Sequence, residues 1–309
     1  MTWVWVSLLA YFLLAVSSVL DKALLKRRIP NPSVFSFYVS ILGVVAFVLA
    51  PFGLKWIGFS LLSMSIFSGA LFTYAMLFMF MAVRKNEVSR VTPLVISAIQ
   101  IVTFLIAIIF SVEILNFQKI AGVALLFFGG FFISFDLPIK SLKIFSGFKF
   151  AVLGGFLFAL AYSLFGYIYR DENAGFVSGF IWTRVGLLIG GASLLIVPSF
   201  RKEIFSTLRA GSKKKKKNRK GKKSTIFLFF VNKASSSIAS VLMNYAFSIG
   251  SVAYVQAMAS AQFVFVLLLA SIASMRRPDI FEEKLYFWDW FQKIVSIGII
   301  GVGVALVSL

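Results

Sequence analysis

Long apolar runs separated by short polar segments follow one another along almost the whole chain. A helix that crosses the hydrocarbon core of a bilayer needs roughly 20 apolar residues. The apolar residues are continuous rather than alternating with polar ones, which favours helices over the strands of a membrane barrel. About ten membrane-spanning helices are therefore predicted, at Trp3–Leu20, Ser33–Pro51, Ile57–Ala82, Val91–Ser111, Phe117–Phe135, Phe150–Tyr169, Gly175–Pro198, Thr225–Ser248, Val252–Ser274 and Asp289–Ser308.

The four residues FQKI occur twice, at 117–120 and 291–294, and each copy opens an apolar run of similar length. Other short segments of the two halves match in the same order. The matching pairs are 34–43 with 177–186, 82–91 with 246–255, and SAIQ at 97–100 with ASAQ at 259–262.

This order predicts a duplicated unit of about five helices. We assign the first repeat to 1–136, a connecting loop to 137–149, and the second repeat to 150–309. Because five is odd, the second copy enters the membrane upside down. Inverted repeats are an architecture of transporters, with the substrate site between the repeats near the middle of the membrane. The FQKI segments themselves are expected to be scaffold.

Lys and Arg are concentrated in the loops that follow the odd-numbered spans. The loops after even-numbered spans hold only Lys55, Lys119 and Arg170 of the 31 basic residues. Since cytoplasmic loops are enriched in Lys and Arg, the odd loops are predicted to be cytoplasmic and both termini to lie outside. The longest of them, at 199–224, is predicted to be a flexible basic loop. We expect its Lys213–Lys223 segment to contact anionic lipids rather than nucleic acid.

Composition supports a membrane protein and argues against an enzyme. The chain is 60% hydrophobic and only 14% charged, whereas a soluble domain is about 25% charged. The predicted fold class is therefore an all-α integral membrane protein, and we expect it in a bacterial cytoplasmic membrane. Neither Cys nor His occurs, which removes the commonest general base and the usual metal ligands. No metal, cofactor or catalytic residue is expected.

The segment EVSRVTPLVISAIQIVTFLIAIIFSVEILNFQKIAGVALLFFGG, residues 87–130, resembles the fourth and fifth helices of a known family. That family is the EamA-like, ten-helix branch of the drug/metabolite transporter superfamily. Ser89, Pro93, Glu113 and Gly122 fall where it usually has a small residue, a helix-opening proline, a glutamate and a glycine. The resemblance implies that helices one to four and six to nine surround a central cavity. It also implies that both termini are cytoplasmic, whereas the distribution of Lys and Arg predicts that they lie outside. The lysine-rich loop is not a general feature of the family.

Only two full charges lie deep inside predicted spans, Arg184 and Lys233, and helix geometry puts them at similar depth. Lys233 heads a polar stripe at helical spacing on its span. We predict a cationic, hydrogen-bonding cavity; under the alternative, small polar residues are packing contacts and the cations bind carbonyls. The cavity candidates are Arg184, Lys233, Ser237, Asn244, Gln256, Gln262, Gln100, Trp182, Tyr162 and Tyr74. The phenylalanines are expected to be mostly lipid-facing.

These observations favour a secondary transporter of a small metabolite, anionic or zwitterionic, that works by alternating access. The carboxylates lie near span ends or in loops, so a facilitator or exchanger is expected rather than a carrier with a deep proton relay. The alternative is a non-transporting membrane scaffold or lipid-interacting protein with a polybasic cytoplasmic loop.

Overall fold

The computed structural model describes residues 2–25, 31–85, 88–110, 116–133, 147–213, 222–276 and 287–308. All regular secondary structure in these ranges is helical. Five helical segments are long and apolar enough to cross a membrane, and four shorter apolar helices accompany them. The expectation of an all-α protein is confirmed, and these lengths fit a membrane protein. Most of the predicted connecting loop at 137–149 lies outside the described residues.

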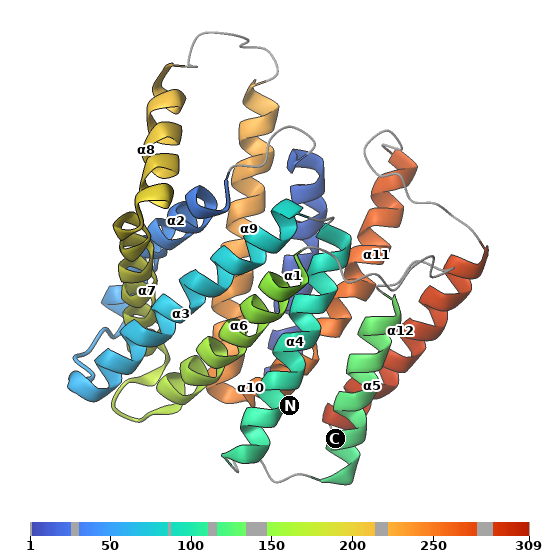
Figure 1. Ribbon diagram of the computed structural model, residues 1–309. Helices are drawn as coiled ribbons and strands as arrows, with labels where there is room; N and C mark the ends of the chain where they lie inside the picture. The colour runs from blue at the N-terminus through green and yellow to red at the C-terminus, as the bar shows by residue number, and fades with distance from the viewer. Residues whose placement is uncertain are drawn as a thin grey trace. The chain divides into compact units, whose positions relative to one another are not determined.

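The chain folds into two compact units, each of which draws helices from both halves of the sequence. Unit 1 comprises residues 1–29, 107–144 and 219–309, and unit 2 comprises 30–106 and 145–218. The helices of unit 1 are α1 (Thr2–Leu25), α5 (Phe117–Ile133), α9 (Lys222–Ile249), α10 (Val252–Ala257), α11 (Ala259–Arg276) and α12 (Phe287–Ser308). The helices of unit 2 are α2 (Pro32–Leu42), η1 (Gly43–Phe52), α3 (Gly58–Lys85), α4 (Val88–Ile109, whose last turn belongs to unit 1), α6 (Phe148–Arg170), α7 (Gly175–Ser193), η2 (Leu194–Ile196) and α8 (Pro198–Lys213). Figure 1 labels the α-helices.

Helix occupies the described part of all ten predicted ranges, but three of them are irregular, the seventh because it ends in the short 3-10 helix η2. The second range changes from α-helix to 3-10 helix at Gly43. The ninth is broken at Met258 into α10 and α11. No glycine or proline lies near Met258, so this break has no counterpart in the usual sequence signals.

The range 199–224 was predicted to be a flexible loop. In the structure, its residues 199–213 belong to the helix α8. Ile204 of α8 is fully buried against Val34, Leu77 and Leu194. The hydroxyl of Ser33, in the first turn of α2, donates to the carboxylate of Glu203 at 2.5 Å. These contacts join α8 to α2, α3 and η2. Residues 214–221, which carry most of the Lys213–Lys223 segment, lie outside the described ranges.

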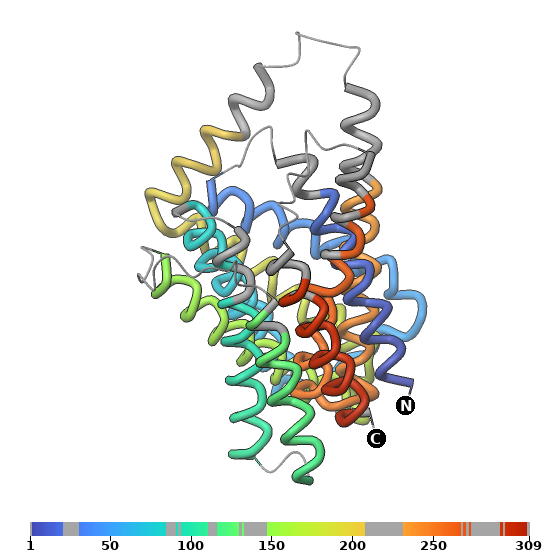
Figure 2. Tube along the Cα trace, turned by 90° about the vertical axis from the view of Figure 1, so that its right-hand side faces the viewer, coloured from blue at the N-terminus to red at the C-terminus, as the bar shows by residue number. Residues whose placement is uncertain are grey.

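The two FQKI segments form a reciprocal pair between α5 and α12, which pack along each other (Figures 1 and 2). The side-chain amide of Gln118, near the start of α5, donates to the carbonyl of Leu306 near the end of α12. The amide of Gln292, near the start of α12, donates to the carbonyl of Phe132 near the end of α5. The helices are therefore antiparallel, and each copy of the repeated glutamine binds the far end of the other helix.

Some helix pairs of unit 1 have counterparts in unit 2. In unit 1, α1 packs against α9 and α11. In unit 2, α6 packs against α3, and Gly155 of α6 lies against Ala98 of α4. In the predicted repeats, α1 of the first half corresponds to α6 of the second. In the same way, α3 corresponds to α9, and α4 corresponds to α10 together with α11. The same pairings therefore occur in both units.

Tyr11 of α1 holds the region of the break in unit 1. Its side chain is 2% exposed, and its hydroxyl donates to the carbonyl of Val255 at 2.9 Å. Val255 lies in the short helix α10, three residues before Met258. A tyrosine hydroxyl from a neighbouring helix thus binds backbone close to the point where the helix is interrupted.

We predict that Tyr11→Phe lowers the free energy of unfolding by about 1–3 kcal/mol, because the buried carbonyl of Val255 loses a hydrogen-bond donor. Thermal unfolding in detergent measures this change. Tyr167→Phe is the matched control, since Tyr167 is exposed on α6, and it should melt with the wild type. Equal melting temperatures for the two variants would contradict the assigned role of Tyr11.

Candidate functional site

Arg184 lies within unit 2, on α7, surrounded by aromatic rings. Its side chain is only 6% exposed. The guanidinium carbon lies 4.3 Å from the ring centre of Phe180 and 6.0 Å from that of Phe165. Rings at these distances attract a cation through their negative faces, and the attraction strengthens when water is excluded. The side chain also lies close enough to Tyr162 and Tyr169 for electrostatic interaction.

These rings belong to a continuous aromatic cluster. Phe158, Tyr162, Phe165 and Tyr169 follow spacings of four, three and four, so they share one face of α6. Ring centres of successive members lie 5.8–6.2 Å apart. Phe72 of α3 contacts three of them, and Phe176 and Phe180 extend the cluster onto α7.

The expectation that phenylalanines are mostly lipid-facing is wrong for this cluster. Phe158, Phe165 and Phe180 are each at most 5% exposed. In a membrane helix, hydrophobicity does not distinguish a lipid-facing ring from a buried one, because lipid is as apolar as a protein core. The four-three-four spacing on α6 was the available signal.

Close contact between α3 and α7 fixes the helix that carries Arg184. Gly69 of α3 faces the backbone of Thr183, Gly186 and Leu187, while Gly186 of α7 faces the backbone of Ser65 and Ile66. Small residues let membrane helices approach until their backbones touch. The hydroxyl of Thr73 adds a hydrogen bond to the carbonyl of Leu187 at 3.1 Å. Arg184 therefore projects from a closely packed pair of helices.

The other four candidates of unit 2 lie in four different places. Tyr162 belongs to the aromatic cluster and is the candidate that the fold brings to Arg184. The indole of Trp182 donates to the carbonyl of Lys55 at 3.1 Å, in the connection between η1 and α3. Tyr74 shares a hydrogen bond with Ser193 at 2.8 Å, and Gln100 is buried on α4. Trp182, two residues from Arg184, points about 200° away around the helix.

The candidates of unit 1 lie mainly on α9 and at the break. Lys233 is half-buried and Ser237 is exposed on α9, while the buried Asn244 donates to the carbonyl of Ser240 at 2.7 Å. Gln256 accepts a long hydrogen bond from Tyr11 at 3.5 Å. The amide of Gln262 donates to Ser18 of α1 at 3.3 Å. The fold thus brings Gln256 and Gln262 to α1.

A buried polar contact between α1 and α9 was missed by the sequence analysis. Ser17 of α1 donates to the amide oxygen of Asn232 at 2.5 Å and also shares a hydrogen bond with Ser236. Ser235 donates to the carbonyl of Leu13 at 3.1 Å. These residues form the face of α9 that packs on α1, so Ser237, which is exposed, belongs to another face. The amide Asn232, which precedes Lys233 at the end of an apolar run, was a usable signal.

Lys119 of the first FQKI segment contacts an aromatic ring of unit 1. Its ammonium lies 5.3 Å from the ring centre of Tyr254 in α10. A cation at this distance is attracted to the ring face. The FQKI segment therefore also contacts the broken helix of unit 1.

Unit 2 has two hollows on its surface, and Arg184 lines neither of them. One, of about 270 Å³, lies at the η1–α3 and α6–α7 connections, with Lys55 and Glu172 on its walls. The other, of about 420 Å³, lies along α4 and α6. Among the residues that the structure describes, no group of three His, Cys, Asp or Glu could hold a metal ion.

Comparison with known proteins gives a structural likeness. No family model matches the chain, and no curated protein matches it. A solved structure described only as "Crystal structure of protein" superposes with a TM-score of 0.68 at 15% sequence identity. The match covers 100% of this chain and 99% of that one. That likeness shows a shared fold and carries no information on function.

Proposed function

We propose that this chain is a secondary transporter of a small metabolite, built from two inverted five-helix repeats around a central cavity and working by alternating access. The repeats correspond to 1–136 and 150–309. The assignment to EamA-like drug/metabolite transporters, which rests on the sequence resemblance, is part of the proposal. So are the bacterial cytoplasmic membrane and the orientation with odd-numbered loops inside.

The observation that carries the proposal is the reciprocal bonding of the two repeated glutamines. Gln118 binds the end of α12 and Gln292 binds the end of α5. A pair of equivalent residues exchanging equivalent bonds across antiparallel helices is what a two-fold axis between inverted repeats requires. The matching pairs α1–α9 and α6–α3 support the same symmetry.

Two cations support a cavity that recognises an anionic group. Arg184 on α7 and Lys233 on α9 are the two cations predicted to lie deep in the membrane, and under the proposed symmetry their helices occupy non-equivalent positions. A cation in the membrane interior is costly and usually faces a cavity or a partner. A guanidinium that stacks on a ring can still offer edge donors to a carboxylate or phosphate. The proposed substrate therefore carries such a group.

The buried state of Arg184 fits a closed conformation in this proposal. With a 6% exposed side chain, Arg184 meets substrate only after neighbouring helices part. Rocking of one bundle against the other supplies such a movement in transporters of inverted-repeat design. The mechanism therefore alternates between states in which the cations are sealed and states in which they meet water from one side.

A ligand screen by thermal stability tests the function. Wild type and an Arg184→Ala, Lys233→Ala double variant are purified in detergent and mixed with amino acids, organic acids, sugar phosphates and cationic dyes. A ligand at about 100 times its dissociation constant should stabilise the wild type by about 2.7 kcal/mol. That gain should vanish in the folded double variant.

Lys55→Ala is the control for general loss of positive charge, because Lys55 is exposed at the η1–α3 connection. It should respond to the ligand as the wild type does. If no compound stabilises the wild type, and the double variant only unfolds, the cations are structural. The chain is then better explained as a membrane scaffold that uses its basic loop to bind partners or lipid.

A further inference from the structure

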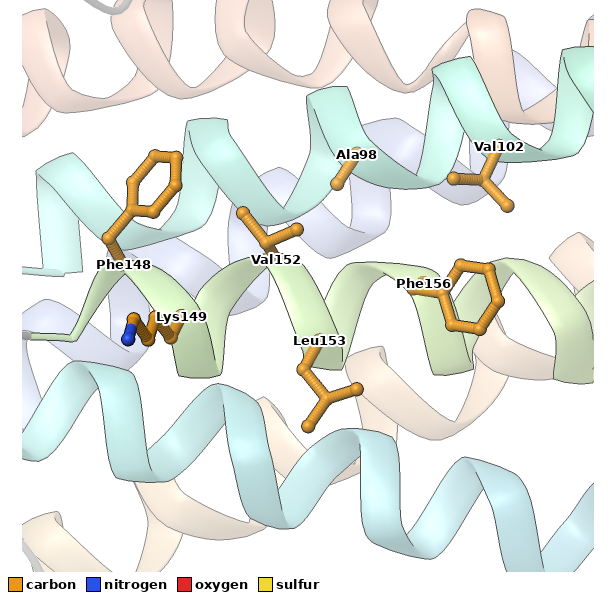
Figure 3. A pocket seen from close by; sticks show the side chains of 7 residues that line it. All are labelled: Ala98, Val102, Phe148, Lys149, Val152, Leu153 and Phe156. Carbon is orange, nitrogen blue, oxygen red and sulfur yellow. The ribbon is translucent and has the colours of Figure 1, made fainter.

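A groove on the surface of unit 2 runs along α6 beside α4, and Figure 3 shows the side chains that line it. Its volume is about 420 Å³. Every lining side chain except one lysine is apolar. The lining residues are Ala98 and Val102 from α4, and Phe148, Lys149, Val152, Leu153 and Phe156 from α6.

One face of α6 forms the floor of this groove. Lys149, Val152, Leu153 and Phe156 follow helical spacing and share that face. The last three are 37–43% exposed, whereas the aromatic cluster around Arg184 occupies a different, buried face of α6. At Gly155 the two helices come so close that a Cβ there would lie 2.6 Å from the Cβ of Ala98. The groove runs beside this close contact, between the exposed faces of α4 and α6.

The length and polarity of the groove match one half of a bilayer. α6 is one of the helices long and apolar enough to cross a membrane. From Lys149 to Phe156 the helix rises about 10 Å, which is most of the roughly 15 Å depth of one half of the hydrocarbon core. Lys149 is the second residue of α6, so we expect its ammonium at the membrane surface if α6 crosses the bilayer. Lysines there attract anionic headgroups by about 1 kcal/mol each.

We propose that this groove binds an anionic glycerophospholipid. One acyl chain lies along the apolar floor between α4 and α6, and the headgroup phosphate accepts hydrogen bonds from the ammonium of Lys149. A lipid fits better than a further helix, because the groove combines an apolar floor with a cation at its outer end. The site uses no residue of the proposed substrate cavity and none of the Lys213–Lys223 segment.

Native mass spectrometry of the purified full chain tests the headgroup contact. Phosphatidylglycerol and phosphatidylcholine with identical acyl chains are titrated separately. The wild type should bind phosphatidylglycerol about fivefold more tightly, which is the factor that about 1 kcal/mol supplies. Lys149→Gln should lose this preference, while Lys55→Gln, which removes an exposed lysine elsewhere in unit 2, should keep it.

Val152→Trp tests the groove itself, because it fills the space without changing the charge. It should weaken binding of both lipids, whereas Ile189→Trp, at an exposed position of α7, should not. Equal behaviour of Lys149→Gln and Lys55→Gln would overturn the proposal, since the preference then comes from other basic residues. So would a dimer that dissociates on Val152→Trp while lipid binding persists, because the groove is then an interface between copies of the chain.

Discussion

Replacing Gly69 with alanine is expected to destabilise the protein by about 3 kcal/mol, at the upper end of the usual cost of overpacking. A Cβ at Gly69 would lie 2.2 Å from the carbonyl oxygen of Thr183 and 2.5 Å from the backbone nitrogen of Leu187. Both atoms belong to the backbone of α7 and cannot rotate away as a side chain can. The only relief is to separate α3 from α7, which also disturbs the bond from Thr73 to Leu187.

The matched control is Gly298→Ala on α12, where a new Cβ meets nothing within 4 Å. Alanine is a better helix former than glycine, so this variant should be as stable as the wild type or more stable. Thermal unfolding in detergent compares the two. If Gly69→Ala and Gly298→Ala melt at the same temperature, the close α3–α7 contact is not what holds Arg184 in place.

The sequence predicted the helices well because the bilayer imposes a simple rule on length and polarity. Helix was found in the described part of every range predicted from an apolar run. The FQKI segments were expected to be scaffold, but the pairing of α5 with α12 through their glutamines was not predicted. The helix α8 was not predicted, because its basic residues were interpreted as part of a flexible loop that contacts lipid. The spacing of Phe200, Ile204 and Thr207 is that of one helix face, and Ile204 is fully buried.

The site was harder to predict than the helices. Membrane helices are apolar on all sides, so the pattern does not show which face meets protein. For this reason the aromatic cluster around Arg184 was missed, and Trp182 was grouped with residues that it does not contact. The polar residues of α9 lie on two different faces of the helix. Asn232 packs against α1, whereas Ser237 lies on an exposed face. Which of several polar faces is buried depends on tertiary packing.

Ser237→Cys is expected to react with a charged, membrane-impermeant maleimide. The chain contains no cysteine, so a single introduced thiol can be followed without further substitutions. In the proposed transporter, Ser237 lines the cavity and meets water in each access state. A thiol reacts as its thiolate, which water stabilises and hydrocarbon does not. A shift of one pKa unit alone changes the thiolate fraction about tenfold.

Ile238→Cys is the matched control, because Ile238 is the next residue of α9, at nearly the same depth, and is 54% exposed. We expect this side chain to face lipid. Its thiol should therefore react at least about tenfold more slowly than that of Ser237→Cys. Both variants should remain folded, since each changes an exposed position.

Labelling in sealed vesicles of both orientations tests the central claim most directly, because it needs no knowledge of the substrate. Alternating access predicts that Ser237→Cys reacts with reagent added from either side of the membrane, and that Ile238→Cys reacts from neither. Reaction of Ser237→Cys from one side only, or from neither, would contradict a transport cavity at α9 and favour a membrane scaffold.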